Sequence, residues 1–308
     1  MAAAEQREAR AMASTVRVVV VDGPPGSTSR AVAHIRDLER CWTRFAPTSD
    51  TARLNTAGGR PVVVHPSTLV LVSALVEGWR LTAGRFDPST LPALVAAGYG
   101  ASIDDPTRTT ALPPEAIVGA DLALVEVDPS ACTVRLPPGA VLDPGGLGKG
   151  LAADLAVERL LAEGAAGALV SIGGDLAVAG TPPSGGSWSV AVDDPSRAGH
   201  PLVALHVDAG GIATSSTLSR RIGPGGRDHH VIDPVTARPL ATDVASATVV
   251  APTAWRAEAL ATATLVGGSQ DAVAYMEGQG VDGVVVTLGG QVLATPAATP
   301  VPEREAVG

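Results

Sequence analysis

The stretch Val141-Leu-Asp-Pro-Gly-Gly-Leu-Gly-Lys-Gly-Leu-Ala-Ala-Asp154 places four glycines, one lysine and two aspartates between an apolar run and a run with helical spacing. Glycine lets the backbone come close to a ligand, the free N–H groups at a helix start favour an anion, and Lys149 adds a mobile positive charge. The pattern predicts a Gly-rich turn that opens a helix and can hold a phosphate. A plain structural turn is the alternative.

Two common phosphate motifs do not match this stretch. A P-loop needs a glycine at position 143 and Ser or Thr after the lysine, whereas the chain has Asp143 and Gly150. A dinucleotide fingerprint that begins at Gly146 needs its third glycine at position 151, where leucine stands. The turn therefore has to be interpreted together with the rest of the chain.

The composition is that of a globular and rather apolar chain of 308 residues, 45% hydrophobic and 17% charged. This length buries one large core or two moderate ones. The net charge of -9 argues against a general surface for nucleic acid or anionic membranes. Aromatic residues are only 3%, so any pocket for a ring is expected to be largely aliphatic. Cys41 and Cys132 form no disulfide framework or metal cluster, although one bridge between them stays possible.

The two ends differ in composition from the centre. Residues 1–11 are polar and Ala-rich and are expected to form a flexible leader, and residues 297–308 are expected to be a disordered tail. The region 12–296 is expected to be one folded domain. No apolar run approaches the ~20 residues of a membrane helix, and charged residues stand where a signal peptide needs an apolar core. We therefore expect no membrane span and a cytoplasmic location.

The hydrophobic pattern alternates between strands and amphipathic helices. A helix after Lys149, a buried strand and a second Gly-Gly turn are typical of a βαβ-like unit whose two turns border one cleft. The prolines between residues 84 and 92 are expected to prevent regular structure. Helices are expected at 29–45, 67–83, 151–162, 253–266 and 270–279, and strands at 15–22, 61–64, 121–127, 133–136, 168–172, 188–193, 202–207, 245–250 and 283–288.

Small polar motifs along the chain together suit a magnesium-bound phosphate ester, although each has an ordinary structural alternative. Asp175 after two glycines is a candidate pocket residue or a cap, and the Thr-Ser-Ser run at 214–216 supplies hydroxyls or is a loop that bonds its own backbone. The His-His pair before Ile-Asp-Pro supplies an imidazole beside a carboxylate or forms a solvated turn. Glu258 and Thr262 share one helix face, as metal ligands or as a partly exposed surface.

The order of these motifs resembles the family of FAD:protein FMN transferases, the ApbE family, from about Met12 to Gly268. Seven motifs in one order make this resemblance specific. They are Met12 to Thr15, Ser49 to Asn55, Gly84 to Pro92, Asp143 to Gly150 with Asp154, Ile172 to Asp175, Ala213 to Ser215 with Arg220 or Arg221 and the run His230 to Pro234, and Ala257 to Thr262.

The resemblance implies an α+β enzyme with a mixed fold of interleaved α/β lobes and an FAD cleft between them. Such an enzyme takes FAD as substrate, uses Mg²⁺ or Mn²⁺, moves FMN onto a Thr or Ser hydroxyl of an acceptor protein, and releases AMP. The resemblance assigns the metal to Glu258, Thr262 and a main-chain oxygen near Gly148, an oxygen-only set that Mg²⁺ prefers. It assigns the flavin nucleotide to Ser49, Asn55, Asp87, Gly145, Gly146, Gly148, Lys149, Gly173, Gly174, Asp175, Thr214, Ser215 and His230.

Within that reading, His230 is the candidate base, with an ordinary pKa near ~6.5. Asp233 is the candidate that orients its ring, and Lys149 would hold phosphate oxygens. Glu258 stands where the family usually has Asp, which moves the carboxylate by one methylene and puts metal affinity in question. Hydrolysis of FAD to FMN and AMP, or FAD binding without turnover as a carrier, are the alternative functions.

Overall fold

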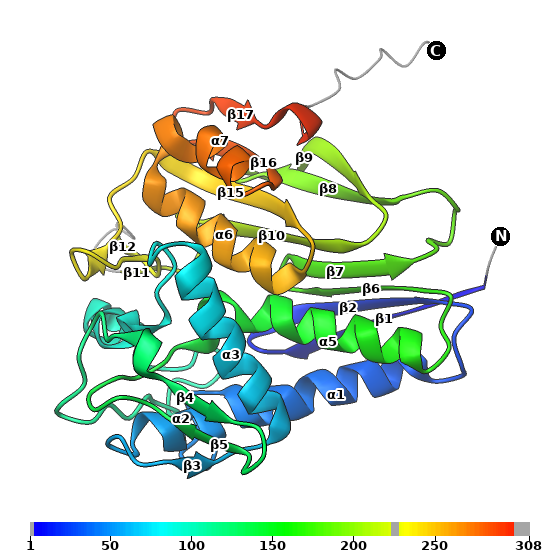
Figure 1. Ribbon diagram of the computed structural model, residues 1–308. Coiled ribbons are helices and arrows are strands. Elements are labelled where there is room, and N and C mark those ends of the chain that lie inside the picture. Colours follow the sequence, from blue (N-terminus) through cyan, green and yellow to red (C-terminus); the bar gives the residue numbers. More distant parts are fainter. Residues whose placement is uncertain (1–2, 223–227, 299–308) are drawn as a thin grey trace.

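The computed structural model describes residues 3–222 and 228–298, and one eight-stranded sheet runs through it (Figure 1). Every pair of neighbouring strands in this sheet is antiparallel. The expected α+β class is confirmed. The strands, in spatial order, are β1 (Ala4–Ala11), β2 (Ser14–Val21), β6 (Gly167–Ile172), β7 (Asp175–Gly180), β10 (Gly210–Ser216), β15 (Val244–Ala251), β16 (Asp282–Thr287) and β17 (Val292–Ala294).

The run of valines in β2 shows how the sequence builds two hydrophobic layers. Successive side chains of a strand point to opposite faces of the sheet. Val18 and Val20 therefore enter the core on the helical face, whereas Val19 and Val21 enter a separate core on the other face. A central strand buried on both faces needs a continuous apolar run, which this segment provides.

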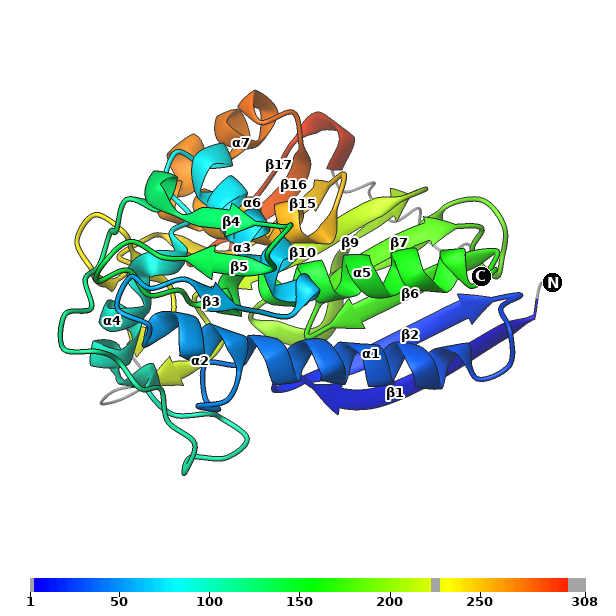
Figure 2. The same cartoon turned by 60° about the horizontal axis from the view of Figure 1, so that its bottom comes forward.

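Helices cover one face of the sheet and a long hairpin packs on the other (Figures 1 and 2). In both views α1 and α5 lie side by side on the helical face, and α6 follows α5. On the opposite face the indole N–H of Trp188 donates to the main-chain oxygen of Gly180 at 3.0 Å. The elements are α1 (Ser27–Trp42), α3 (Pro66–Leu81), α5 (Gly148–Ala162), α6 (Ala254–Gly267), α7 (Ser269–Gly278), and the hairpin strands β8 (Trp188–Asp194) and β9 (Arg197–Val207).

Shorter elements surround one end of this framework. A three-stranded sheet, β3–β5–β4, packs beside α3 and includes the expected hairpin at 121–136. The remaining elements are α2 (Asp50–Asn55), β3 (Val62–Val63), η1 (Pro88–Thr90), α4 (Leu91–Leu94), the π-helical turn η2 (Val95–Tyr99), η3 (Leu122–Leu124), β4 (Glu126–Asp128), β5 (Thr133–Arg135), η4 (Pro144–Gly146), β11 (Arg221–Ile222), β12 (Asp228–His229), β13 (Ile232–Asp233), β14 (Arg238–Pro239) and η5 (Pro296–Ala298).

Several expectations from the sequence are wrong. Residues 4–11 of the expected leader form strand β1, because their backbone pairs with β2 along its whole length. The proline-rich segment 84–92 contains η1 and the start of α4, since a proline is tolerated in the first helical turn. Residues 136–143, directly before the Gly-rich turn, form no strand, and β6 pairs antiparallel with both neighbours, so the unit is not βαβ.

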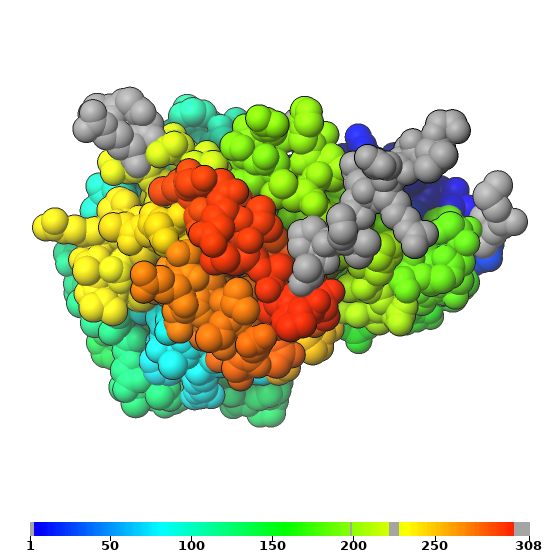
Figure 3. Space-filling model, turned by 90° about the horizontal axis from the view of Figure 1, so that it is seen from above, coloured from blue at the N-terminus to red at the C-terminus, as the bar shows by residue number. Residues whose placement is uncertain are grey.

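The C-terminal elements close one face of the molecule. Seen from above, the orange and red surfaces of α7 and β17 adjoin each other and the yellow segment that carries β11 to β14 (Figure 3). Of the expected tail, Ala298 is buried in η5, and residues from 299 on lie outside the described part. Within the described residues, no helix has the length and apolar character needed to cross a membrane.

Candidate functional site

A pocket of about 350 Å³ opens where the Gly-rich turn, the end of β10, helix α6 and the segment around His230 meet. Motifs more than a hundred residues apart in the sequence come together in its wall. The expected residues that line it are Asp87, Gly145, Gly146, Gly148, Lys149, Gly173, Asp175, Thr214, Ser215, His230, Glu258 and Thr262.

The Gly-rich turn owes its shape to side chains before it. The Asp143 carboxylate accepts a hydrogen bond from the Gly145 amide at 3.2 Å and so caps the short helix η4. The Asn55 side chain donates to the main-chain oxygen of Leu142 at 2.9 Å and accepts from its amide at 2.8 Å. Asn55 thus fixes the backbone of Leu142, directly before the turn, without itself lining the pocket.

Lys149 lies between two buried carboxylates at the centre of the pocket. Its ammonium forms ion pairs with Asp175 and Glu258, whose side chains are only 3% and 4% exposed. Burial opposes the charged form of Lys149, but attraction to Asp175 and Glu258 outweighs it and raises the pKa of the lysine. Burial also raises the pKa of Glu258, with attraction to Lys149 opposing and repulsion from Asp175 adding. Two carboxylates for one ammonium leave a negative excess at this point.

A two-residue turn places Asp175 at this point. Gly173 and Gly174 join β6 to β7 and both have positive φ, 64° and 100°, which suits a tight hairpin turn. A Cβ on Gly173 would also come within 2.7 Å of the Ser14 hydroxyl oxygen, so any side chain there would have to displace Ser14. Asp175 is therefore the first residue of a strand in the pocket wall and not a cap.

Hydroxyl groups lie next to the acidic centre. Ser215 Oγ is 2.9 Å from Thr262 Oγ1, and the Thr214 amide donates to Asp175 at 3.3 Å. The Thr-Ser-Ser run at 214–216 belongs to strand β10, so the alternative of a loop that bonds its own backbone is wrong. The strand positions the hydroxyls by its pairing with β15, so they do not depend on local turns.

Helix α6 receives its position from α5. The Asp154 carboxylate accepts from the amides of Ala254 and Trp255 at 2.8 and 3.0 Å, and thereby caps the first turn of α6 from another helix. A Cβ on Gly150 would lie 2.5 Å from the Ala254 carbonyl oxygen, so the two backbones touch there. The Gly150 amide also donates to Glu258 at 2.8 Å. These contacts direct Glu258 and Thr262 into the pocket.

His230 lies in the opposite wall. Burial, and then the positive charge of Arg220, lower its pKa from 6.5 to about 4, while a hydrogen bond with the Ser219 main chain opposes this shift. Its Nδ1 is buried and has no partner among the residues that the structure describes. The Tyr99 ring meets it edge-on, with centroids 6.2 Å apart. The imidazole is therefore neutral at pH 7, with a pKa far below the ordinary value expected from the sequence.

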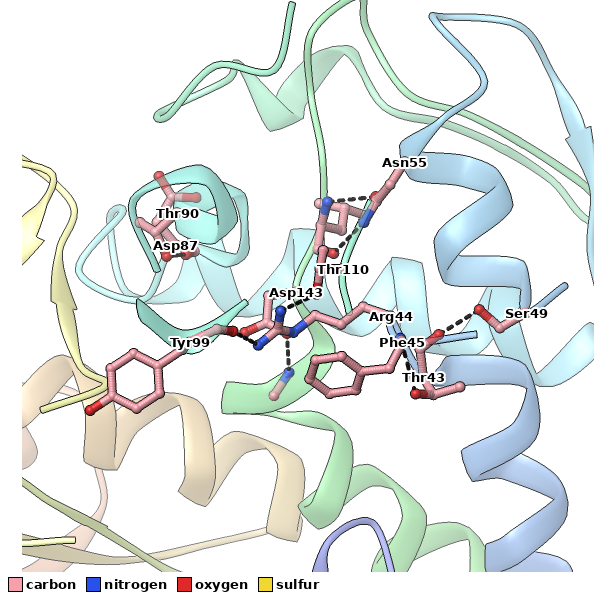
Figure 4. A network of polar contacts seen from close by, with 12 residues as sticks. Thr43, Arg44, Phe45, Ser49, Asn55, Asp87, Thr90, Tyr99, Thr110 and Asp143 are labelled. Carbon is pink, nitrogen blue, oxygen red and sulfur yellow. Dashed lines mark hydrogen bonds and ion pairs between the residues drawn. The ribbon is translucent and has the colours of Figure 1, made fainter. Parts of the chain in front are cut away.

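Arg44 is the centre of a polar network in the pocket wall (Figure 4). Its guanidinium donates to the main-chain oxygen of Tyr99 at 2.8 Å and to the Thr110 hydroxyl, and its Nε lies 3.3 Å from Asp143. It also stacks over the Phe45 ring, 4.3 Å from the centroid. The network joins the Gly-rich turn to the loop that begins after η2.

Comparison with known proteins agrees with this arrangement. The model of the ApbE family matches residues 12–288. The chain belongs to the ApbE family. The ApbE protein of Thermotoga maritima superposes with a TM-score of 0.83 at 25% identity, covering 96% of this chain and 97% of that one. The flavinyl transferase ApbE of Pseudomonas stutzeri, in its apo form, gives 0.80 at 26% identity, with 96% of each chain covered.

Curated ApbE relatives carry one name. An "FAD:protein FMN transferase" of Rhodobacter capsulatus is 33% identical over 283 residues, which cover 86% of this chain and 51% of the relative. One of Treponema pallidum is 32% identical over 259 residues, covering 77% and 70%. The chain thus spans about half the length of the first relative and most of the second.

The donor atoms of this ApbE pocket fit a magnesium ion. Glu258, Thr262 and Ser215 offer only oxygen, and Mg²⁺ binds through one or two carboxylates together with substrate phosphates. No cluster of three or more His, Cys, Asp or Glu that could hold a metal occurs in the described residues. A metal here would therefore have to share its ligands with hydroxyls, main chain and substrate, which agrees with the negative excess beside Lys149.

Some residues expected in the site have other roles. Ser49 caps α2 by accepting from the Ala52 amide at 3.1 Å and does not line the pocket, and neither does Gly174. Asp233 does not orient His230. Its carboxylate accepts from the Val235 amide at 2.9 Å and from the Thr236 hydroxyl, and so closes the turn between β13 and β14. Local turn bonding is the usual use of such an aspartate.

Sequence reasoning missed Thr43, Arg44 and Arg108, which line the pocket. The pocket contains half of the chain's Trp, Tyr and Phe residues, namely Trp42, Phe45, Phe86 and Tyr99, although most of its apolar lining is aliphatic, as expected. Low total aromatic content says nothing about where the few rings gather. Thr43 and Arg44 stand a few residues before the motif Ser49 to Asn55, and this position is the one signal in the sequence that could have indicated them.

Proposed function

We propose that this ApbE protein is an FAD:protein FMN transferase that moves FMN from FAD to a Thr or Ser hydroxyl of an acceptor protein and releases AMP, with Mg²⁺ or Mn²⁺ required. The observation that carries the proposal is the acidic centre of the pocket. Asp175 and Glu258 outnumber Lys149, so this centre alone would repel a diphosphate. A divalent cation reverses the sign of the local charge.

Glu258, Thr262 and a main-chain oxygen near Gly148 are the groups that would hold the metal. When bound, Mg²⁺ supplies positive charge that stabilises the diphosphate oxygens. The amides at the start of α5 and Lys149 add fixed positive potential beside it. Asp154 and Gly150 keep α6 against α5, so the acidic and basic groups stay at a constant separation.

The reaction replaces one P–O bond by another. The acceptor oxygen bonds to the FMN phosphorus, the bond from that phosphorus to the bridging oxygen breaks, and AMP departs with the bridging oxygen. The hydroxyl proton passes to His230, which is neutral at pH 7 because burial and Arg220 lower its pKa to about 4. A diphosphate beside the ring would raise this pKa again and so improve the base.

Incubation of the purified protein with FAD, in Mg²⁺, Mn²⁺ or EDTA, tests the metal-dependent reaction by the AMP that is released. Glu258→Gln should abolish AMP release because the amide loses the charge, whereas Glu258→Asp should keep part of it with altered metal affinity. Glu277→Gln, on the exposed side of α7, is the matched control. AMP release by wild type in EDTA, or by Glu258→Gln at the wild-type rate, would contradict the metal role.

A second measurement separates transfer from hydrolysis. Lysate of the native cell, incubated with the protein and FAD, should yield a protein band with covalent flavin fluorescence on a denaturing gel. FMN and AMP in equal amounts without a fluorescent band would identify an FAD hydrolase. FAD binding without AMP would identify a carrier.

A further inference from the structure

We infer that Arg44 is a positioning residue that holds two separate loops of the pocket in register, and that FAD affinity depends on it. The effect on FAD affinity rests on the proposed function, whereas the role of Arg44 in holding the two loops rests on its hydrogen bonds and ion pair alone. Arg44 touches no group to which the proposed reaction assigns chemistry, so it acts through the loops that it joins.

The first loop is the Gly-rich turn. Asp143 receives the Arg44 Nε at 3.3 Å with the same oxygen, Oδ1, that accepts the Gly145 amide at 3.2 Å. The Arg44 guanidinium therefore helps to orient the Asp143 oxygen that caps η4 through the Gly145 amide. The guanidinium is 9% exposed and the carboxylate 16%, so water screens the pair little. Loss of Arg44 would leave Asp143 without its charge partner at the point where the turn meets a diphosphate.

The second loop runs from Tyr99 to Thr110 and supplies further pocket residues, among them Ser102 and Ile103. Its two ends are close, because the Thr110 amide donates to the Gly100 oxygen at 2.8 Å. Arg44 binds both ends, through the Tyr99 carbonyl and the Thr110 hydroxyl. Tyr99 in turn donates its hydroxyl to the Arg220 carbonyl, which brings the His230 wall into the same network.

Only arginine has the geometry for this task. Its planar fork carries five donors in fixed directions, so one group reaches a carboxylate, a carbonyl and a hydroxyl at once while its face stacks on Phe45. A lysine ammonium keeps the charge but cannot span these partners. The residue before Phe45 therefore couples segments that lie 55 and 66 residues further along the chain.

Amide hydrogen exchange of the two loops tests the structural part without FAD. Arg44→Met should speed exchange in peptides covering 141–150 and 99–111, Asp143→Asn only in the first, and Thr110→Val only in the second. Arg40→Met, which removes an equal charge from an arginine that is 73% exposed on α1, should speed neither. Exchange in Arg44→Met equal to that in Arg40→Met would overturn the inference.

FAD affinity, measured by quenching of flavin fluorescence, tests the functional part. Arg44→Met should raise the FAD dissociation constant on the order of 10–100-fold, since hydrogen bonds to charged groups are of this strength. KM for FAD should rise with little change in kcat, and Arg44→Lys should recover only part of the affinity. In Arg44→Met/Asp143→Asn the losses should be less than additive. Additive losses, or unchanged affinity in Arg44→Met, would refute the link to FAD. Wild type that binds no FAD would refute the proposed function and this link, while the exchange result still decides the loop role.

Discussion

Lys149→Met removes one positive charge from between two buried carboxylates. The lysine side chain is 16% exposed, against 3% for Asp175 and 4% for Glu258. Methionine keeps the unbranched apolar stem and lacks only the ammonium, so the change is mainly electrostatic. Lys149 is also the only lysine in the sequence, where arginine supplies every other strongly basic side chain. A compact ammonium fits between two carboxylates that a broad guanidinium would push apart.

The expected loss of stability is large for a single substitution. Breaking a buried ion pair by removing one partner costs roughly 3–5 kcal/mol, because the other charge stays buried without compensation. Here two carboxylates remain, and protein domains are stable by only about 5–15 kcal/mol. We therefore expect the free energy of unfolding to fall by roughly a third or more. If water reaches the site, the loss should lie near the lower end of the roughly 3–5 kcal/mol range.

Urea unfolding in EDTA without FAD measures this effect apart from ligand binding. The double variant Lys149→Met/Glu258→Gln has the same net charge at this centre as wild type, so it should be more stable than Lys149→Met alone. Glu258→Gln alone leaves a balanced pair of Lys149 and Asp175 and should be nearly as stable as wild type. The reasoning is refuted if Lys149→Met unfolds within about 1 kcal/mol of wild type, the range of a solvent-screened pair, or if Glu258→Gln restores nothing.

Three other predictions concern neighbouring groups. His230→Ala should slow AMP release by ~10²–10⁴-fold with an FAD dissociation constant close to that of wild type; equal rates would move the base elsewhere. Gly150→Ala should destabilise the fold by about 1–3 kcal/mol, because its Cβ would lie 2.5 Å from the Ala254 oxygen, and an unchanged urea midpoint would contradict this contact. Asp154 has its pKa raised by burial to about 6, so its contribution to stability is present at low pH and is lost as pH rises through 6. The stability of wild type relative to Asp154→Asn should fall by up to about 3 kcal/mol between pH 4 and pH 7, and a constant difference would argue against the shift.

Elements with a strong hydrophobic period could be predicted from the sequence, and weakly patterned ones could not. The valines of β2 and the apolar stripes of α1 and α3 could be recognised because the buried residues recur at the spacing of a strand or a helix. Strand β1 has few apolar residues because it lies at the sheet edge and its side chains are mostly exposed. Its register comes from pairing with β2, which no local pattern records.

Some residues of the site could likewise be predicted from local sequence, and others could not. Lys149, Asp175 and Glu258 stand beside glycines or on a helix face, where local sequence indicates an unusual role. Arg44 stands in an ordinary polar segment, and its importance depends on partners that reach it only through the tertiary fold. Asp233 shows the opposite error, since this aspartate, three residues after His230, uses its carboxylate to hold its own turn.

Gly150 explains why the central stretch differs from a P-loop. That motif has Ser or Thr after its lysine, so that a hydroxyl meets the metal. In this fold the backbone of α6 occupies the space where such a side chain would extend, as the 2.5 Å approach to Ala254 shows. Under the proposed function, the hydroxyl beside the phosphate would come from another element, and Thr262, one turn beyond Glu258 on α6, lines the same pocket. In the proposed reaction, the helix that leaves no room for a hydroxyl at position 150 would itself supply one, from Thr262.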